Sequence, residues 1–314
     1  MNFSRGLDRM RRQPAVTWAG ILAYLALTIP THDLVQGVFI AYRDVVGVRV
    51  YHVSVLLAAV ALAVLILWPA VRRGGRRLWR WWVLTAVYAV GVYVLFISVS
   101  SELVHVPQYA LLAIPLYALT RSACDTVALA AILGAIDEGY QYLVLHSTWT
   151  VYFDFNDVLI DAVGAALGVV WLLSVLPGRA AATKRRGAAV AWRELRRSPA
   201  LGGLVAIGAA VVILLASGAL VVDAVGADSD FYVPLTRGEA QEGFWAHREW
   251  AGKPFHILRP LPGSTLIILT ILPFAALGTE PCNKESAAAI RRAAALITVG
   301  LLGLAGVMFV AIGG

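Results

Sequence analysis

The sequence predicts an all-α protein, a polytopic bundle of about nine transmembrane helices with its N-terminus inside the cell. Hydrophobic residues make up 60% and charged residues 14% of the 314 residues, which excludes an ordinary soluble domain. Apolar segments long enough to cross about 30 Å of hydrocarbon recur along the chain. Segments of this length form helices because the backbone in lipid must satisfy its own hydrogen bonds.

The predicted helices fall into two groups. The first six form a unit over residues 1–177, and the last three form a C-terminal extension over residues 200–314, with an extracytoplasmic loop at 223–263. A basic cytoplasmic linker, 178–199, joins the two groups. The eighth helix is short enough to be re-entrant. The predicted spans are 15–31, 53–71, 81–99, 104–120, 124–145, 157–177, 200–222, 264–278 and 294–312.

The distribution of Lys and Arg predicts the orientation. With the N-terminus inside, 20 of the 26 Lys and Arg residues fall in the N-terminal segment and the cytoplasmic connections, as the positive-inside rule requires. The net charge of +7 is therefore an insertion signal that also favours anionic inner-leaflet lipids. Nucleic acid is not an expected partner, because the basic residues lie in short loops without a binding module. Cys124 and Cys282 both fall on the cytoplasmic side and are expected to be free thiols.

Ionisable side chains are concentrated in the most apolar half of the chain. A charged group in a bilayer costs a few kcal/mol, so it usually faces a partner or a wet cavity. Helical spacing places these residues on the faces of three successive helices. The three faces are Glu102, His105 and Tyr109 with Gln108 at the edge; Gly134, Glu138 and Gln141; and Asp154, Asp157 and Asp161, continued by Gly164 and Gly168.

The predicted orientation puts the three faces at one depth. The fourth helix starts outside, the fifth ends outside and the sixth starts outside, so all three polar faces lie near the extracytoplasmic surface. His32 and Asp33, at the outer end of the first helix, reach the same level. Gly164 and Gly168 would let the sixth helix approach a neighbour closely. The sequence therefore predicts a shallow polar cavity that opens to the outer leaflet.

The order of these motifs resembles the VanZ family, named for a membrane protein linked to teicoplanin resistance. The resemblance covers about residues 15–177 and implies a setting at the outer face of the cell envelope, with a lipid or glycopeptide ligand. Two departures make this site more acidic than the family pattern. The family commonly has Asn at the position of Asp161, and often an Arg shortly before Asp154, where this chain has Thr150, Val151 and Tyr152. The matching residues are Glu102-x-x-His105-x-x-Gln108, Gly134-x-x-x-Glu138-x-x-Gln141 and Asp154-x-x-Asp157-x-x-x-Asp161-x-x-Gly164-x-x-x-Gly168.

Two roles are open for the ionisable residues. A hydrogen-bond network between helices would stabilise by only about 0.6 kcal/mol per pair, against an insertion cost of a few kcal/mol per charge. Stability alone is therefore a poor reason for so many charges, although Asp154 and Asp157 could cap the sixth helix. Asp137 is expected on a different face, as a solvated or packing residue. The predicted catalytic residues are Glu102, His105, Glu138, Asp157 and Asp161, and the predicted substrate-binding residues are Gln108, Tyr109, Gln141, Asp154 and Asp33.

Three functions are compatible with this pattern. The first is an intramembrane enzyme that hydrolyses or transfers a lipid-linked or cell-envelope substrate. Close carboxylates in a low dielectric cannot both stay ionised cheaply, so they suit a general acid and base. A divalent cation such as Mg, Mn or Ca could bind the same oxygens. The alternatives are a non-enzymatic binder or carrier of an envelope lipid or glycopeptide, and a structural membrane subunit. In each case the expected location is a bacterial or archaeal cytoplasmic membrane. The family resemblance adds an expected effect on teicoplanin susceptibility.

Overall fold

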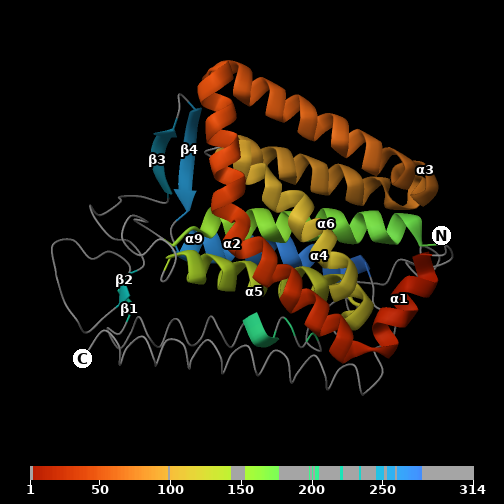
Figure 1. The fold of residues 1–314 in the computed structure, drawn as a ribbon. Helices are drawn as coiled ribbons and strands as arrows, with labels where there is room; N and C mark the ends of the chain where they lie inside the picture. The colour runs from red at the N-terminus through yellow and green to blue at the C-terminus, as the bar shows by residue number, and fades with distance from the viewer. Residues whose placement is uncertain are drawn as a thin grey trace.

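The fold is described from a computed structural model. It describes residues 3–97, 100–142, 153–176, 198, 200, 202–204, 220–221, 233–234, 245–250, 253–258 and 260–277. These residues are predominantly helical, which confirms the all-α prediction, and two short strand pairs are added to the helices (Figure 1). The ninth predicted helix, Cys282, most of the linker 178–199 and most of the span 200–222 lie outside the described residues.

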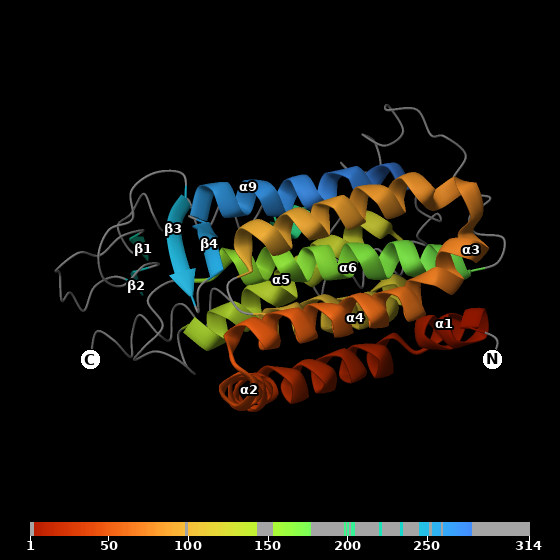
Figure 2. The same ribbon diagram turned by 90° about the horizontal axis from the view of Figure 1, so that it is seen from above.

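The first described helices are a short α1 (Phe3–Arg12) and a long α2 (Pro14–Val46). Pro14 suits the first helical position, where its missing N–H would have no partner. Pro30 lies inside α2, and proline is a common cause of a bend such as the one α2 shows in Figures 1 and 2. The predicted first span, 15–31, is shorter than α2, which extends to Val46. The helix continues until Gly47, which adopts a φ of 82°.

One long helix, α3 (Val48–Phe96), takes the place of the second and third predicted spans. The predicted connection at 72–80 is helical, although α3 turns back on itself so that its halves run in opposite directions (Figures 1 and 2). The second half is attached to the rest of the protein by polar contacts. Trp82 Nε1 donates to Ser174 Oγ at 3.1 Å, and Thr270 Oγ1 donates to Tyr88 Oη at 2.9 Å.

The centre of the molecule consists of three helices whose bounds lie close to the predicted ones. They are α4 (His105–Thr120), preceded by the 3-10 turn η1 (Ser100–Val104), then α5 (Ala123–Tyr140) and α6 (Phe155–Val175). Helix α6 is predominantly apolar, apart from Asn156, Asp157 and Asp161 near its start, and it packs against α3, α4, α5 and α9, as expected of a buried helix.

Small residues set the distance between α4 and α6. A Cβ at Gly164 would lie 2.7 Å from the Val106 carbonyl oxygen, and a Cβ at Gly168 would lie 2.8 Å from Ala110 Cα. The neighbour that the predicted glycine pair lets α6 approach is therefore α4. At a third glycine, Gly263, an added Cβ would lie 2.6 Å from the Cβ of Phe155 at the start of α6.

The predicted outer loop 223–263 contains an antiparallel hairpin, β3 (Trp245–Trp250) and β4 (Lys253–Leu258). A parallel pair, β1 (Leu220–Val221) and β2 (Val233–Pro234), is also present. The hairpin leads into α9 (Pro260–Ile271) and the 3-10 turn η4 (Leu272–Leu277), close to the eighth predicted span. Ile267, Ile271, Phe274 and Leu277 belong to the same hydrophobic core as α5 and α6, so this part of the C-terminal extension packs onto the first six-helix unit.

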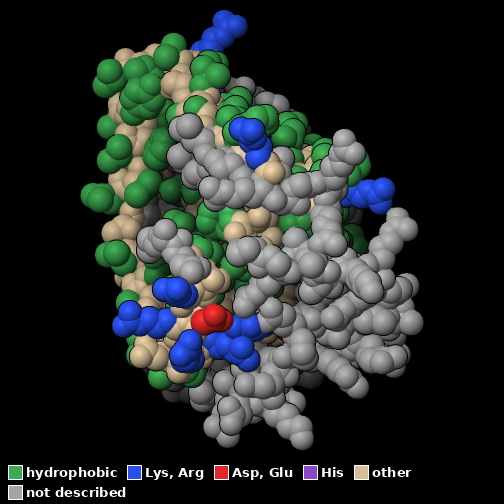
Figure 3. All heavy atoms as spheres, turned by 90° about the vertical axis from the view of Figure 1, so that its right-hand side faces the viewer, with side chains coloured by type: hydrophobic (Ala, Val, Ile, Leu, Met, Phe, Trp, Pro, Cys, Tyr) green, Lys and Arg blue, Asp and Glu red, His purple; other side chains and the backbone are tan. Residues whose placement is uncertain are grey.

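Within the described ranges, four helical segments are long and apolar enough to cross a membrane: Pro14–Val46, Leu78–Phe96, Glu102–Thr120 and Phe155–Val175. They indicate a membrane protein. In its most apolar window Phe155–Val175 has 83% of residues buried inside the protein, and Pro14–Val46 has 17%. The first is an inner helix and the second is peripheral. Arg side chains gather at the end of the molecule that carries α1 (Figure 3).

Candidate active site

Three helix ends meet at the end of the bundle opposite these arginines. They are the start of α4, the end of α5 and the start of α6, and β4 lies beside them (Figure 1). This arrangement follows from the antiparallel run of three helices joined in sequence. It brings His105 from α4 together with Asp157 and Asp161 from α6.

His105 lies between two carboxylates of one helix. Its Nδ1 is 2.9 Å from Asp161 Oδ1, and its Nε2 is 3.9 Å from Asp157 Oδ2. Asp157 and Asp161 are four residues apart, so both carboxylates lie on the same face of α6. His105 and Asp161 are buried, whereas the Asp157 side chain is 13% exposed. The Tyr109 ring lies parallel to the imidazole, with ring centroids 6.4 Å apart.

A second layer of the site comes from α5. Tyr109 Oη donates to Asp137 Oδ2 at 3.5 Å, and Gln141 Nε2 donates to Asp137 Oδ1 at 3.0 Å and to Glu138 Oε1 at 3.2 Å. All four side chains are buried. The expectation that Asp137 is a solvated or packing residue on a separate face is therefore wrong. Its distance of four residues from Gln141 is the signal that could have placed it in the cluster.

Gly134 makes room for the Asp161 carboxylate. A Cβ at this position would overlap Asp161 Oδ2 and would lie 3.1 Å from Asp161 Cβ. The second predicted face thus includes a glycine because α5 passes directly over the carboxylate that holds His105.

The start of α6 is fixed by two polar residues. Asp154 is the N-cap and accepts a hydrogen bond from the Asn156 N–H at 2.8 Å, so the capping role considered for Asp154 is realised. The Asn156 side chain is buried, donates to the carbonyls of Phe96 and His256 at 3.0 and 2.8 Å, and accepts from Leu258 N–H at 3.0 Å. Asn156 therefore joins α3, β4 and α6 next to Asp157. Sequence reasoning missed it, because its partners are main-chain groups of distant segments.

The outer rim of the site is acidic. Glu102, Asp154 and Asp157 are partly exposed, and Asp157 interacts electrostatically with the other two as well as with His105 and Asp161. Glu138, behind them, interacts with the charges of Asp137, Asp154, Asp157 and Asp161. Six carboxylates so close together in a low dielectric cannot all be ionised cheaply, so we expect them to share protons.

Two predicted substrate-binding residues are not placed in the cluster. The described contact of Gln108 is through its main chain, whose carbonyl accepts from Tyr24 Oη at 3.1 Å. Asp33, like His32, belongs to α2, but its side chain lies outside the described residues. Residues 150–152, where the sequence departs from the family pattern, also lie outside the described residues.

The described side chains do not form a metal site by geometry. In the ranges given above, no group of three or more His, Cys, Asp and Glu residues could hold a metal ion. The divalent cation remains a prediction. The arrangement that is present, an imidazole hydrogen-bonded to one carboxylate and facing another, is suited to proton transfer.

Comparison of the chain with protein-family models, with curated proteins and with solved structures finds no match. The candidate function is consequently argued from the site and from the sequence motifs.

Proposed function

We propose that this is a VanZ-like, multi-pass protein of a bacterial or archaeal cytoplasmic membrane that performs acid–base hydrolysis or transfer at the extracytoplasmic face. The substrate class is a lipid-linked or cell-envelope molecule. The observation that carries the proposal is the position of His105, which is buried among helices and held 2.9 Å from Asp161 Oδ1 and 3.9 Å from Asp157 Oδ2.

His105 is the proton-transfer group in this proposal. When Nδ1 carries the proton, it donates to Asp161, which fixes the tautomer and the orientation of the ring. Nε2 then faces Asp157, the carboxylate with access to the rim. A carboxylate that orients a histidine in this way is also the arrangement that supports general base catalysis in the serine hydrolases. Asp157 and Glu138 are the acids and bases that would exchange protons with it.

The carboxylates of the rim favour one class of substrate headgroup over another. Carboxylates accept hydrogen bonds from hydroxyl and amino groups, and they repel phosphate oxygens. Glu102, Asp154 and Asp157 are therefore better suited to a sugar or amino-sugar headgroup than to a phosphate, which agrees with an envelope glycolipid or glycopeptide.

Packing gives a reason to prefer this function to a purely structural role. The contacts of Gly164 and Gly168 already bring α4 and α6 together, and apolar side chains fill the space between them. The carboxylates are not needed for that contact. Placing them in an apolar bundle costs a few kcal/mol per charge, which a role in chemistry would explain.

The test compares cells that produce the wild-type protein with cells that produce Glu138→Gln, in which the shape of the side chain is kept. We expect altered membrane lipids or cell-wall precursors and altered teicoplanin susceptibility, with an unchanged amount of protein in the membrane. Asp8→Asn, a carboxylate at the opposite end of the bundle, is the matched control and should behave as wild type.

Two further outcomes separate the alternatives. Loss of turnover with substrate binding retained in the purified variant supports the enzyme, whereas loss of binding itself supports a carrier. A profile that is identical in wild type, Glu138→Gln and control contradicts both and leaves a structural subunit.

A further inference from the structure

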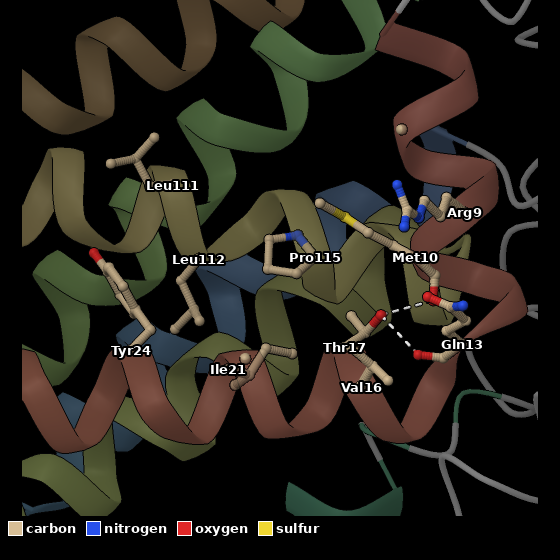
Figure 4. Close-up of a pocket in the computed structure, with 12 residues that line it drawn as sticks. Arg9, Met10, Gln13, Val16, Thr17, Ile21, Tyr24, Leu111, Leu112 and Pro115 are labelled. Carbon is tan, nitrogen blue, oxygen red and sulfur yellow. Dashed lines mark hydrogen bonds between the residues drawn. The ribbon is translucent and has the colours of Figure 1, made fainter.

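A groove of about 590 Å³ lies between α1, α2 and α4, away from the His105 site (Figure 4). Its floor is formed by buried apolar side chains, including Ile21 and Leu112. Its sides include Val16 and Leu111, which are 65% and 58% exposed. The groove is thus apolar inside and open along its length, and its volume is in the range of small-molecule sites.

One end of the groove carries its charged group, Arg9. Figure 4 shows Arg9, Met10 and Gln13 at this end and Tyr24 and Leu111 at the other. The end is shaped by the corner between α1 and α2, where Thr17 Oγ1 donates to the Met10 carbonyl at 2.7 Å and is 3.1 Å from the Gln13 carbonyl oxygen.

Arg9 is placed at this end because its helix, α1, is fixed to the bundle. Leu7 is buried, Asp8 Oδ1 accepts from Arg121 Nη2 at 3.0 Å, and the Phe3 ring packs edge-on against Trp171. Arg9 itself is exposed and belongs to the last turn of α1, at the arginine-rich end of the molecule.

The length of the groove matches one leaflet of a bilayer. From Gln13 to Tyr24 along α2 the helix rises by about 16 Å, and half the hydrocarbon thickness is about 15 Å. Both long walls belong to candidate membrane-spanning helices, so the open side faces the place where lipid would lie.

We propose that this groove binds an anionic phospholipid, with one acyl chain along α2 and α4 and the phosphate on Arg9. The apolar floor, the length and the single charged end are the features that such a lipid matches. A basic side chain near a membrane surface attracts anionic lipid by about 1 kcal/mol. The inference does not depend on the function proposed for the His105 site.

Gly20 offers a direct test, because a Cβ at this position would have no atom within 4 Å. Gly20→Leu should therefore fill the groove without disturbing the helices. Gly37→Leu is the matched control, since Gly37 lies in the same helix, is equally open and does not line the groove.

The measurement is binding of phosphatidylglycerol and of phosphatidylcholine with identical acyl chains to the purified full-length protein in detergent, by native mass spectrometry. We expect wild type to prefer phosphatidylglycerol and Gly20→Leu to lose about 10-fold or more of the binding of both lipids, while Gly37→Leu binds as wild type. Arg9→Gln should reduce the preference for phosphatidylglycerol about 5-fold, the equivalent of about 1 kcal/mol, and Arg12→Gln should leave it unchanged.

Three results would overturn the proposal. The first is unchanged binding in Gly20→Leu, and the second is an equal loss in Gly37→Leu. The third is competition by glycerophosphoglycerol, the headgroup without acyl chains, at the concentration at which the intact lipid competes, because the apolar groove would then contribute nothing.

Discussion

The two ends of the α4–α6 bundle hold their acidic residues in different ways. At the arginine-rich end each described carboxylate has separate partners: Asp8 pairs with Arg121 at 3.0 Å, and Asp125 accepts from Ser198 Oγ and from Ala200 N–H. At the other end the carboxylates crowd around one another and around His105.

The difference separates carboxylates that stabilise the fold from those assigned to proton transfer in the proposed function. An acidic group with its own donor stabilises the fold locally, as a cap or as a tie between segments. Several carboxylates that face each other oppose folding, and they are retained most often where their protonation is used. Substitutions of the titratable side chains should therefore have different consequences at the two ends, mainly on activity at the crowded end and mainly on stability at the arginine-rich end.

The largest expected effect is on activity, at the crowded end. His105→Gln should reduce turnover of the proposed envelope substrate about 100-fold or more, because the proposed general acid–base group is lost. The Gln amide can still donate to Asp161, so the protein should insert and accumulate as wild type. Turnover in isolated membranes, normalised to protein amount, is the measurement. Wild-type turnover in this variant would show that the site does not use the imidazole.

The next effect is on stability, and it arises from the close packing of α5 against Asp161 at the same end. Gly134→Ala places a methyl group against the Asp161 carboxylate and should destabilise the protein by about 2–3 kcal/mol, the usual cost of overpacking. Thermal unfolding in detergent measures it. Gly139→Ala, in the same helix with no atom within 4 Å, is the control and should be neutral or slightly stabilising. Equal unfolding temperatures for the two variants would mean that α5 does not press on Asp161.

At the opposite end, Asp125→Ala should change stability and leave activity intact. The substitution removes the acceptor of the Ser198 hydroxyl and the Ala200 N–H, at a cost of about 1–2 kcal/mol. The checks are thermal unfolding together with turnover per folded molecule. A loss of turnover at unchanged stability would contradict the division between the two ends.

The smallest effect is expected for Asp8→Asn. The Asp8 side chain is 42% exposed, and ion pairs at that exposure contribute about 0–1 kcal/mol. Screening by salt should remove the difference, so wild type and variant should unfold at the same temperature in 1 M salt. A difference that persists at high salt would show that the pair is shielded from solvent.

The sequence predicted the inner helices better than the outer ones. The bounds of α4, α5 and α6 agree within a few residues, because each is a largely apolar run. The predicted loops after 31 and at 72–80 are helical. Hydropathy identifies the residues that suit the hydrocarbon core of a membrane. It does not identify the end of a helix, because polar residues can continue the helix outside that core. The break that does occur is at Gly47, whose φ of 82° is costly for other residues.

The candidate site was predictable in part for a related reason. Spacing along one helix places Asp157 and Asp161 on one face, and it does the same for His105 and Tyr109. Spacing does not show which helix faces meet across a bundle. It therefore predicts a separate face for Asp137, whereas the Asp137 carboxylate contacts Tyr109. Asn156 depends on the main chain of β4, about 100 residues away, and no local pattern encodes that partner.

The separation of His105 and Asp161 in the chain has a consequence for biosynthesis. They are 56 residues apart and belong to different helices, with α5 between them. A ribosome therefore completes α4 before the carboxylates of α6 that face His105 exist. Only when α6 is made can the glycine contacts draw the two helices together. Among α4, α5 and α6 the acidic cluster is therefore the last feature to assemble, and β4 and α9 are added beside it later still.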